Sequence, residues 1–130
     1  MINIRKTKPE DNRQEISNIY EQSWKTAYRG IVPQDYLDSI PRGSWASKID
    51  SPGWTTLVCE LGGKLIGTTS VCKSRYKEYP DEGEIISIYF LPEYMHKGYG
   101  KQLLAAAVNE LAGYDDIFLW VLEENTNARL

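Results

Sequence analysis

The chain has 130 residues, enough for one domain with a core of its own, so residues 1–130 are expected to form a single domain. Its apolar fraction of 42%, charged fraction of 25% and nine tyrosines indicate a folded globular protein and exclude a disordered one. The net charge of -3, without a long run of one sign, excludes the broad basic surface of a nucleic-acid-binding protein. No apolar run approaches the roughly 20 residues of a membrane span, and the N-terminus lacks the apolar core of a signal peptide, so the expected location is the cytoplasm.

The N-terminal part of the chain predicts a strand followed by two helices. Residues 2–7 alternate apolar and polar side chains, as a half-buried strand does. Over residues 10–28 apolar side chains recur at spacings of three and four, which predicts an amphipathic helix. A short second helix is expected over residues 33–40, because a proline suits its first turn. Residues 41–53, with two prolines and two glycines, are expected to be loop or broken helix.

The middle of the chain predicts a β-hairpin. Residues 54–61 and 64–74 are rich in β-branched side chains, and the pair Gly62-Gly63 between them suits a tight turn. This turn would pair Leu61 with Lys64 and so set the register of the whole hairpin.

That register predicts the positions of the two cysteines. Cys59 is expected to face Ile66, and Cys72 is expected to lie beside Gly53. The two sulfur atoms would then lie roughly 20 Å apart at about 3.3 Å per residue, which excludes a disulfide between them. Neither cysteine belongs to a CxxC or Cys/His pattern, so we expect reduced core cysteines and no metal site.

The C-terminal part of the chain predicts a strand, a helix and a further strand. A strand is expected over residues 84–91, a helix over residues 98–112 and a strand, apolar at every position, over residues 117–122. Such a unit holds its two strands parallel with a right-handed crossover. The expected order is therefore β-α-α-β-β-β-α-β, an α+β fold.

A glycine-rich turn, Gly98-Tyr99-Gly100, stands at the start of the last helix between Lys97 and Lys101. The first amide N–H groups of a helix have no partner within the helix and lie at the positive end of its dipole. Glycines let an anion approach the backbone closely, and the lysines add positive charge. The pattern suits a pyrophosphate, although a glycine-rich helix start without a ligand has the same letters.

Two familiar phosphate motifs fit this turn poorly. A P-loop would need glycine at Met95 and a hydroxyl residue at Gln102. A dinucleotide-binding fingerprint would need a third glycine at Leu103 and would follow its strand directly. Glu123, at the end of the next strand, stands where a ribose-binding acid would, so the dinucleotide alternative stays open.

A third motif matches better. The run IISIYFLPEYMHKGYGKQLL resembles the cofactor motif of the GNAT superfamily of N-acetyltransferases, in which a strand, Pro-x-Tyr and Gln/Arg-x-x-Gly-x-Gly/Ala open a helix. WKTAYRGIVPQDYL is similar to the acceptor-side helices of that superfamily, and LWVLEENTNAR to its next strand and Asn-x-x-Ala segment. The resemblance implies a central mixed sheet, mostly antiparallel with one parallel strand pair, flanked by helices.

The resemblance also implies acetyl-coenzyme A (acetyl-CoA) as cofactor. Its pyrophosphate would lie on the amides of residues 96–101, and its pantetheine arm between the two parallel strands. Met95 departs from the motif at the Gln/Arg position, so weakened affinity is expected. The residues expected to bind the cofactor are Tyr89, Phe90, His96, Lys97, Gly98, Tyr99, Gly100, Lys101 and Asn125.

The implied activity is transfer of an acetyl group to a primary amine of a small molecule or peptide. Glu84 resembles the carboxylate that some members use as general base, with a solvated strand end as the alternative. Backbone N–H near Tyr89 or Phe90 would bind the developing oxyanion if the strand bulges there. Because His96 is the only histidine, schemes that need a second one are excluded.

Several aromatic and acidic residues are candidates for the acceptor pocket, although core packing or a solvated loop explains them equally well. They are Trp24, Tyr28, Tyr36, Tyr76, Tyr79, Asp81 and Glu82.

The last expectation concerns the C-terminus. In the superfamily, a tyrosine that protonates the coenzyme thiolate and a final hairpin strand follow the segment that resembles ENTNAR, and this sequence stops at Leu130. Unless the sequence is a fragment, the strand over residues 117–122 would keep an unpaired edge, from which we expect a homo-oligomer. The alternative function is a coenzyme-A-binding module with little turnover.

Overall fold

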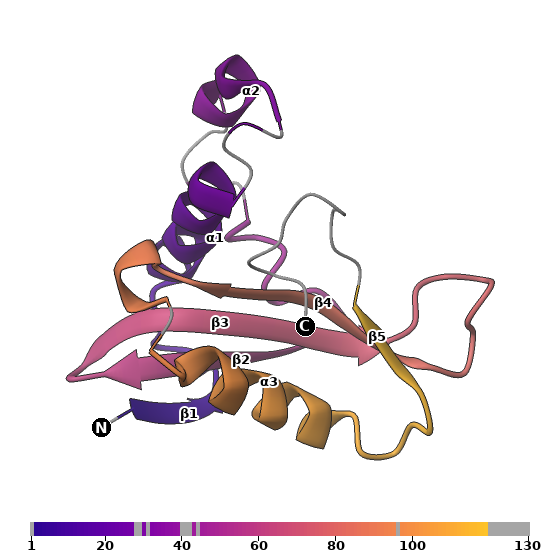
Figure 1. Ribbon diagram of the computed structural model, residues 1–130. Helices are drawn as coiled ribbons and strands as arrows, with labels where there is room; N and C mark the ends of the chain where they lie inside the picture. The colour runs from indigo at the N-terminus through magenta and orange to yellow at the C-terminus, as the bar shows by residue number, and fades with distance from the viewer. Residues whose placement is uncertain are drawn as a thin grey trace.

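A five-stranded mixed sheet forms the centre of the protein (Figure 1). The computed structural model describes residues 2–27, 30, 32–39, 43, 45–95 and 97–119. The strands lie side by side in the order in which they occur in the chain, and only β4 and β5 are parallel. The strands are β1 (Ile2–Lys6), β2 (Thr55–Leu61), β3 (Lys64–Lys73), β4 (Gly83–Phe90) and β5 (Ile117–Leu119).

Helices cover both faces of the sheet, with α1 on one face and α3 on the other (Figure 1). The predicted element order and the mixed sheet are confirmed, and a short 3₁₀ turn, η1, was not predicted. No described helix is long and apolar enough to cross a membrane. The helices are α1 (Arg13–Ala27), α2 (Gln34–Ser39), η1 (Pro92–Tyr94) and α3 (Tyr99–Glu110).

Helix α1 begins three residues later than its periodicity predicts, because a side chain caps it. The Oδ1 atom of Asn12 accepts a hydrogen bond from the backbone N–H of Gln14 at 2.9 Å. This bond satisfies one of the amides that a helix start leaves without a partner. The first turn therefore starts after Asn12 rather than after the proline at position 9.

The β2–β3 hairpin has the predicted turn but not the predicted register. Leu61 pairs with Lys64 as expected, but the register shifts between Cys59 and Glu60. Cys59 consequently pairs with Gly67, so the prediction that it faces Ile66 is wrong. One extra residue in β3, a β-bulge, causes the difference.

The same shift displaces the second cysteine by one position. Thr55 pairs with Val71, so the predicted neighbour of Cys72, Gly53, is wrong by one residue. Both cysteines are buried and free, and burial raises the pKa of the Cys59 thiol to about 11. Among the described residues no three His, Cys, Asp or Glu side chains could hold a metal ion.

A second bulge lies in β4. Ser70 pairs with Ser87 but Val71 pairs with Ile85, which leaves Ile86 as the extra residue of β4. The pairing is regular at Tyr89 and Phe90, so the bulge on which oxyanion binding there was made conditional is not present at those residues. Because side chains alternate along a strand, the extra residue changes which face the preceding side chains occupy.

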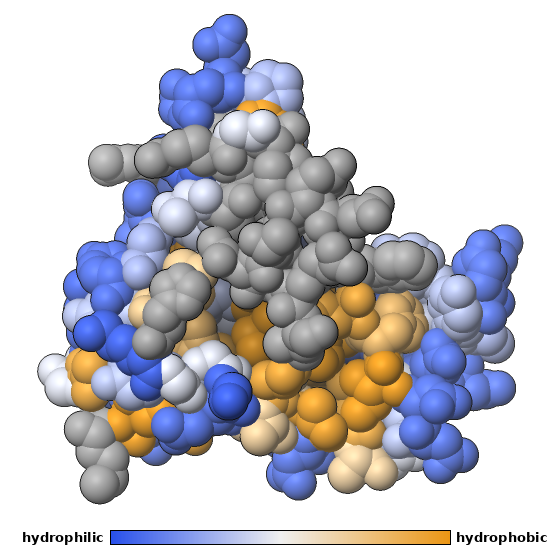
Figure 2. All heavy atoms as spheres, in the orientation of Figure 1, coloured by the Kyte–Doolittle hydropathy of each residue, from blue (hydrophilic) through white to orange (hydrophobic). Residues whose placement is uncertain are grey.

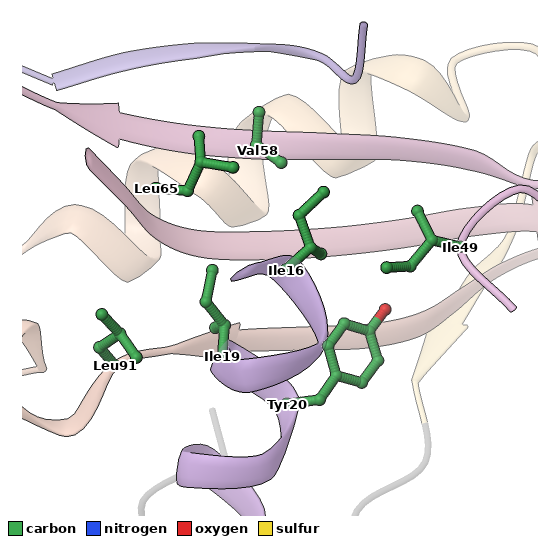
Figure 3. Close-up of a cluster of buried hydrophobic side chains, with 7 residues drawn as sticks. All are labelled: Ile16, Ile19, Tyr20, Ile49, Val58, Leu65 and Leu91. Atoms are coloured by element: carbon green, nitrogen blue, oxygen red, sulfur yellow. The ribbon is translucent and has the colours of Figure 1, made fainter. Parts of the chain in front are cut away.

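The core on the α1 face combines apolar packing with buried hydroxyl groups (Figure 3). The hydroxyl of Tyr20 lies 2.9 Å from Ser87 Oγ and 3.2 Å from Ser70 Oγ, and Ser70 Oγ lies 2.8 Å from Thr56 Oγ1. These bonds tie the helix to three strands and satisfy polar groups that would be costly to bury alone. The buried apolar residues are Ile16, Ile19, Tyr20, Ile49, Val58, Leu65 and Leu91.

The core on the α3 face is almost entirely apolar. Leu103 and Ala107 of α3 are fully buried against it. Figure 2 shows apolar side chains gathered at the surface over α3 and β5, where Ile117 and Leu119 are half-buried. The buried residues are Leu57, Cys59, Ile66, Val71, Ile85, Phe90, Leu103, Ala107 and Leu111.

Gly67 shows how closely this face is packed, and it yields a prediction. A Cβ atom at position 67 would lie 2.5 Å from Cε1 of Phe90, so Gly67→Ala would displace the ring. Overpacking of this kind costs about 1–3 kcal/mol of the free energy of unfolding. Chemical denaturation measures this loss.

The matched control is Gly113→Ala, because a Cβ atom there has no neighbour within 4 Å. The free energy of unfolding of this variant should stay within about 0.5 kcal/mol of the wild type. Equal stability of the two variants would contradict the packing argument.

Candidate active site

Helix α3 starts at the C-terminal side of β4 with its backbone amides uncapped. Gly98 is the N-cap residue and has φ 82°, a left-handed conformation that glycine adopts without strain. No side chain caps this end, and the first turn holds no acidic residue. The amides and the positive end of the helix dipole are therefore available to an anion.

Gly100 and two lysines complete this end of the helix. A Cβ atom at Gly100 would have no described atom within 4 Å, so the space beside this residue is open. Lys97 and Lys101 are both exposed beside it. The predicted positions at Lys97, Gly98, Tyr99, Gly100 and Lys101 are thus brought together, whereas His96 lies outside the described residues.

Met95, where the GNAT motif has Gln or Arg, has a packing role. Its side chain packs against the buried cluster around Phe90 and Leu103. Its backbone N–H donates to the carbonyl of Pro92 at 3.2 Å and closes η1. The residue therefore fixes the turn before α3 and brings no charge to the helix start.

The C-terminal end of β4 lies next to this helix start, since the rings of Phe90 and Tyr99 are 6.5 Å apart. The N–H of Leu91 donates to Ile66 of β3 at 2.8 Å. Backbone groups alternate along an antiparallel strand, so the N–H of Phe90 points away from β3. Its carbonyl accepts a hydrogen bond from Ser23 Oγ at 2.5 Å, which anchors α1 at this point.

Aromatic side chains gather where α1 crosses the end of β4. Trp24 Nε1 donates to the hydroxyl of Tyr89 at 3.1 Å, and the Tyr20 ring lies 5.0 Å from the Tyr89 ring. Trp45 packs against both Tyr20 and Trp24 at 5.6 and 5.8 Å between ring centroids. Trp24, Trp45 and Tyr89 are only half-buried, so this wall of four rings reaches the surface.

The other two candidates from the N-terminal half are not part of this wall. Tyr36 is 54% exposed on α2. Tyr28 lies outside the described residues.

Glu84, at the start of β4, is 1% exposed and forms an ion pair with Arg75. Glu84 Oε1 accepts hydrogen bonds from the backbone N–H and from Nε of Arg75 at 3.1 and 3.0 Å. Oε2 accepts a bond from Nη2 at 2.5 Å. A bidentate pair of this kind is strong and directional, so a solvated strand end does not describe Glu84.

Glu84 lies on the same face of the sheet as α1. Ile85 packs toward α3, so its neighbour Glu84 points to the opposite face. Tyr89 also lies on the α1 face, where it contacts Tyr20. The bulge at Ile86 is what allows two residues separated by an odd number of positions to share a face.

The loop between β3 and β4 packs on β5. The rings of Tyr76 and Tyr79 lie 5.8 and 5.5 Å from the ring of Phe118. Asp81 is exposed and Glu82 is half-buried. This loop carries Arg75, a residue that the sequence reasoning missed because a polar loop without periodicity gives no signal for an ion pair.

The described parallel pairing joins three residues of β4 to three residues of β5. Residues 83–85 of β4 pair with residues 117–119 of β5. Asn125 and residues 120–122 lie outside the described residues. Association through the edge of that strand therefore stays a prediction.

The chain resembles known proteins in sequence. Residues 13–129 match the model of the acetyltransferase (GNAT) family. The chain is 31% identical over 129 residues to the uncharacterized N-acetyltransferase YuaI of Bacillus subtilis, covering 96% of this chain and 74% of that one. It is 27% identical to a spermidine N(1)-acetyltransferase of Thermoplasma acidophilum, covering 96% and 81%.

Solved structures agree with this match. The PaiA N-acetyltransferase of Thermoplasma acidophilum in complex with coenzyme A superposes with a TM-score of 0.76 at 25% identity, covering 97% of this chain and 82% of that one. The ribosomal-protein-S18-alanine N-acetyltransferase of Escherichia coli shares the fold, with a TM-score of 0.70 at 19% identity, covering 98% and 72%. The chain therefore belongs to the GNAT family of acetyltransferases.

Proposed function

We propose that the protein transfers an acetyl group from acetyl-CoA to a primary amine of a small molecule or peptide. The observation that carries this proposal is the uncapped start of α3 beside the end of β4, with Gly98 in a left-handed conformation and two lysines at its rim. This arrangement suits a pyrophosphate, and the PaiA relative was solved with coenzyme A.

The described residues fit acetyl-CoA as cosubstrate. The amides of Tyr99, Gly100 and Lys101 would hold its pyrophosphate, with the lysines adding charge. The N–H of Phe90, directed away from β3, would bind either the pantetheine arm or the carbonyl oxygen of the thioester. The cosubstrate supplies an acetyl group activated as a thioester, so neither a metal nor a covalent enzyme intermediate is needed.

The chain's own groups would move one proton during the reaction. The acceptor nitrogen forms a bond to the acetyl carbon while the bond from that carbon to sulfur breaks. Glu84 takes the proton that the amine loses, through water, since it lies several residues along β4 from Phe90. The departing sulfur ends as a thiol, with its proton drawn from solvent or from a residue outside the described part of the chain.

The acceptor is a primary amine, and its approach is expected on the α1 face. The half-buried rings of Trp24, Trp45 and Tyr89 on this face offer an apolar wall that would suit the carbon chain of an amine. The relative from Thermoplasma acidophilum acts on spermidine, so polyamines and peptide N-termini are the first acceptors to test.

The coenzyme site predicts the effect of a negative charge at the start of α3. Glu at a helix N-terminus stabilises the free helix, so Gly100→Glu should fold and yet repel the pyrophosphate. Two unit charges 4 Å apart interact by about 4 kcal/mol at an effective dielectric constant of 20. Allowing for solvent, calorimetry should record at least a tenfold weaker Kd for coenzyme A, which corresponds to about 1.4 kcal/mol.

Two variants serve as controls for this substitution. Gly100→Ala adds a Cβ atom in open space without charge, and Gly113→Glu adds the charge beyond the other end of α3. Both should bind coenzyme A within about threefold of the wild type, because neither brings a negative charge to the helix start. Unchanged affinity in Gly100→Glu would mean that the site is misplaced.

The role of Glu84 is tested by Glu84→Gln. Loss of a general base costs on the order of 10²- to 10⁴-fold in turnover, while the affinity for coenzyme A should stay the same. Turnover is measured by thiol release with a panel of amines that includes spermidine and an alanine-initiated peptide. Buried Cys59 and Cys72 should add little background to a thiol reagent.

Glu10→Gln is the control, since Glu10 is an exposed carboxylate in the turn between β1 and α1, outside the candidate site. It should turn over like the wild type. An equal rate in Glu84→Gln and Glu10→Gln would remove Glu84 from the mechanism.

A further inference from the structure

We propose that Arg75 is a positioning residue that holds the carboxylate of Glu84 in the orientation in which it accepts the proton of the acceptor amine. The inference rests on the proposed function, because it concerns the same base. It adds the β3–β4 loop, which carries Arg75, to the acceptor end of the site.

The contacts of Arg75 fix both oxygens of the carboxylate. The backbone N–H and Nε hold Oε1 at 3.1 and 3.0 Å, and Nη2 holds Oε2 at 2.5 Å. A carboxylate oxygen accepts two hydrogen bonds, so Oε1 is saturated and Oε2 keeps one free lone pair. The proton of the acceptor is therefore directed to Oε2 of Glu84.

Arg75 is itself held in place by its surroundings. Its guanidinium lies over the ring of Trp54, with 5.7 Å between Cζ and the ring centroid. The next residue in the loop, Tyr76, packs on Phe118 of β5, and Phe118 pairs with Glu84. The side chain is still 46% exposed, so the pair lies at the boundary between protein and solvent.

The charges around Glu84 act in the same direction. Cys72 of β3 pairs with Glu84. Burial raises the pKa of the Cys72 thiol, and the negative charge of Glu84 raises it further, so this cysteine stays neutral. The hydrogen bond to Glu84 raises the pKa of Arg75. Tyr76 also faces the guanidinium, and β5 contributes only the uncharged Phe118. Arg75 is thus the one described cation that compensates the buried carboxylate.

Without the guanidinium, the carboxylate of Glu84 would lose its fixed orientation. The guanidinium donates two of the three described hydrogen bonds that the carboxylate accepts, and only the bond from the backbone N–H of Arg75 would remain. Oε2 would then be free to turn away from the acceptor, so kcat should fall.

The test compares Arg75→Gln, Arg75→Lys and a matched control. Arg13→Gln removes a bidentate pair of the same kind, since Nε and Nη2 of Arg13 each lie 2.9 Å from an oxygen of Asp50. Arg75→Gln should lower kcat at least tenfold with little change in KM for acetyl-CoA. Arg13→Gln should leave both kcat and KM unchanged.

Arg75→Lys separates charge from orientation. A lysine keeps the positive charge but cannot offer the two parallel donors of a guanidinium. We expect it to restore only part of the kcat that Arg75→Gln loses. Full activity in Arg75→Gln would overturn the proposal, even if Glu84→Gln is inactive.

A double variant keeps this result distinct from a failure of the proposed function. In a Glu84→Gln background, Arg75→Gln should lower turnover no further, because both act through one carboxylate. A further loss of turnover in the double variant overturns the role of Arg75, whereas a fully active Glu84→Gln variant overturns the base itself.

Discussion

The structure depends on the parallel pairing of β4 and β5. A parallel neighbour cannot be reached by a tight turn, so the chain must cross back over the sheet, and α3 makes this crossing. A helix that follows β4 and returns along the sheet has to start near the carboxyl end of that strand. The position of the uncapped amides at Gly98 is therefore a result of topology, before any side chain contributes.

The two faces of the sheet differ in how they hold their helices. Packing of Leu103 and Ala107 against apolar side chains holds α3, and such packing is not directional. Hydroxyl groups that connect Tyr20 with Ser70 and Ser87 hold α1 in addition, and these bonds fix its angle and register. Helix α1 is thus held by directional bonds that α3 lacks among its described contacts.

Local patterns in the sequence predicted the elements well, and they predicted long-range geometry poorly. The spacing of apolar residues located α1, and the glycine pair at positions 62 and 63 located the hairpin turn, because both signals arise within one element. The bulges at Ile66 of β3 and Ile86 of β4 were not predicted, since they depend on the strand that lies opposite. The glycine-rich start of α3 was predicted by its motif, whereas Arg75 was missed because its partner lies across a loop.

Because β4 contains an extra residue, Ile86, a deletion of one residue would change the face of the sheet on which its side chains lie. A strand without the bulge would place Glu84 on the face that packs against α3, where a carboxylate would meet Ala107 and Leu111 instead of Arg75. Deleting one residue here would therefore exchange the environments of an acid and an isoleucine while leaving the composition of the strand almost unchanged. Relatives aligned without a gap in this strand should keep the same parity, so an alignment that opens a one-residue gap between Glu84 and Tyr89 compares positions on opposite faces.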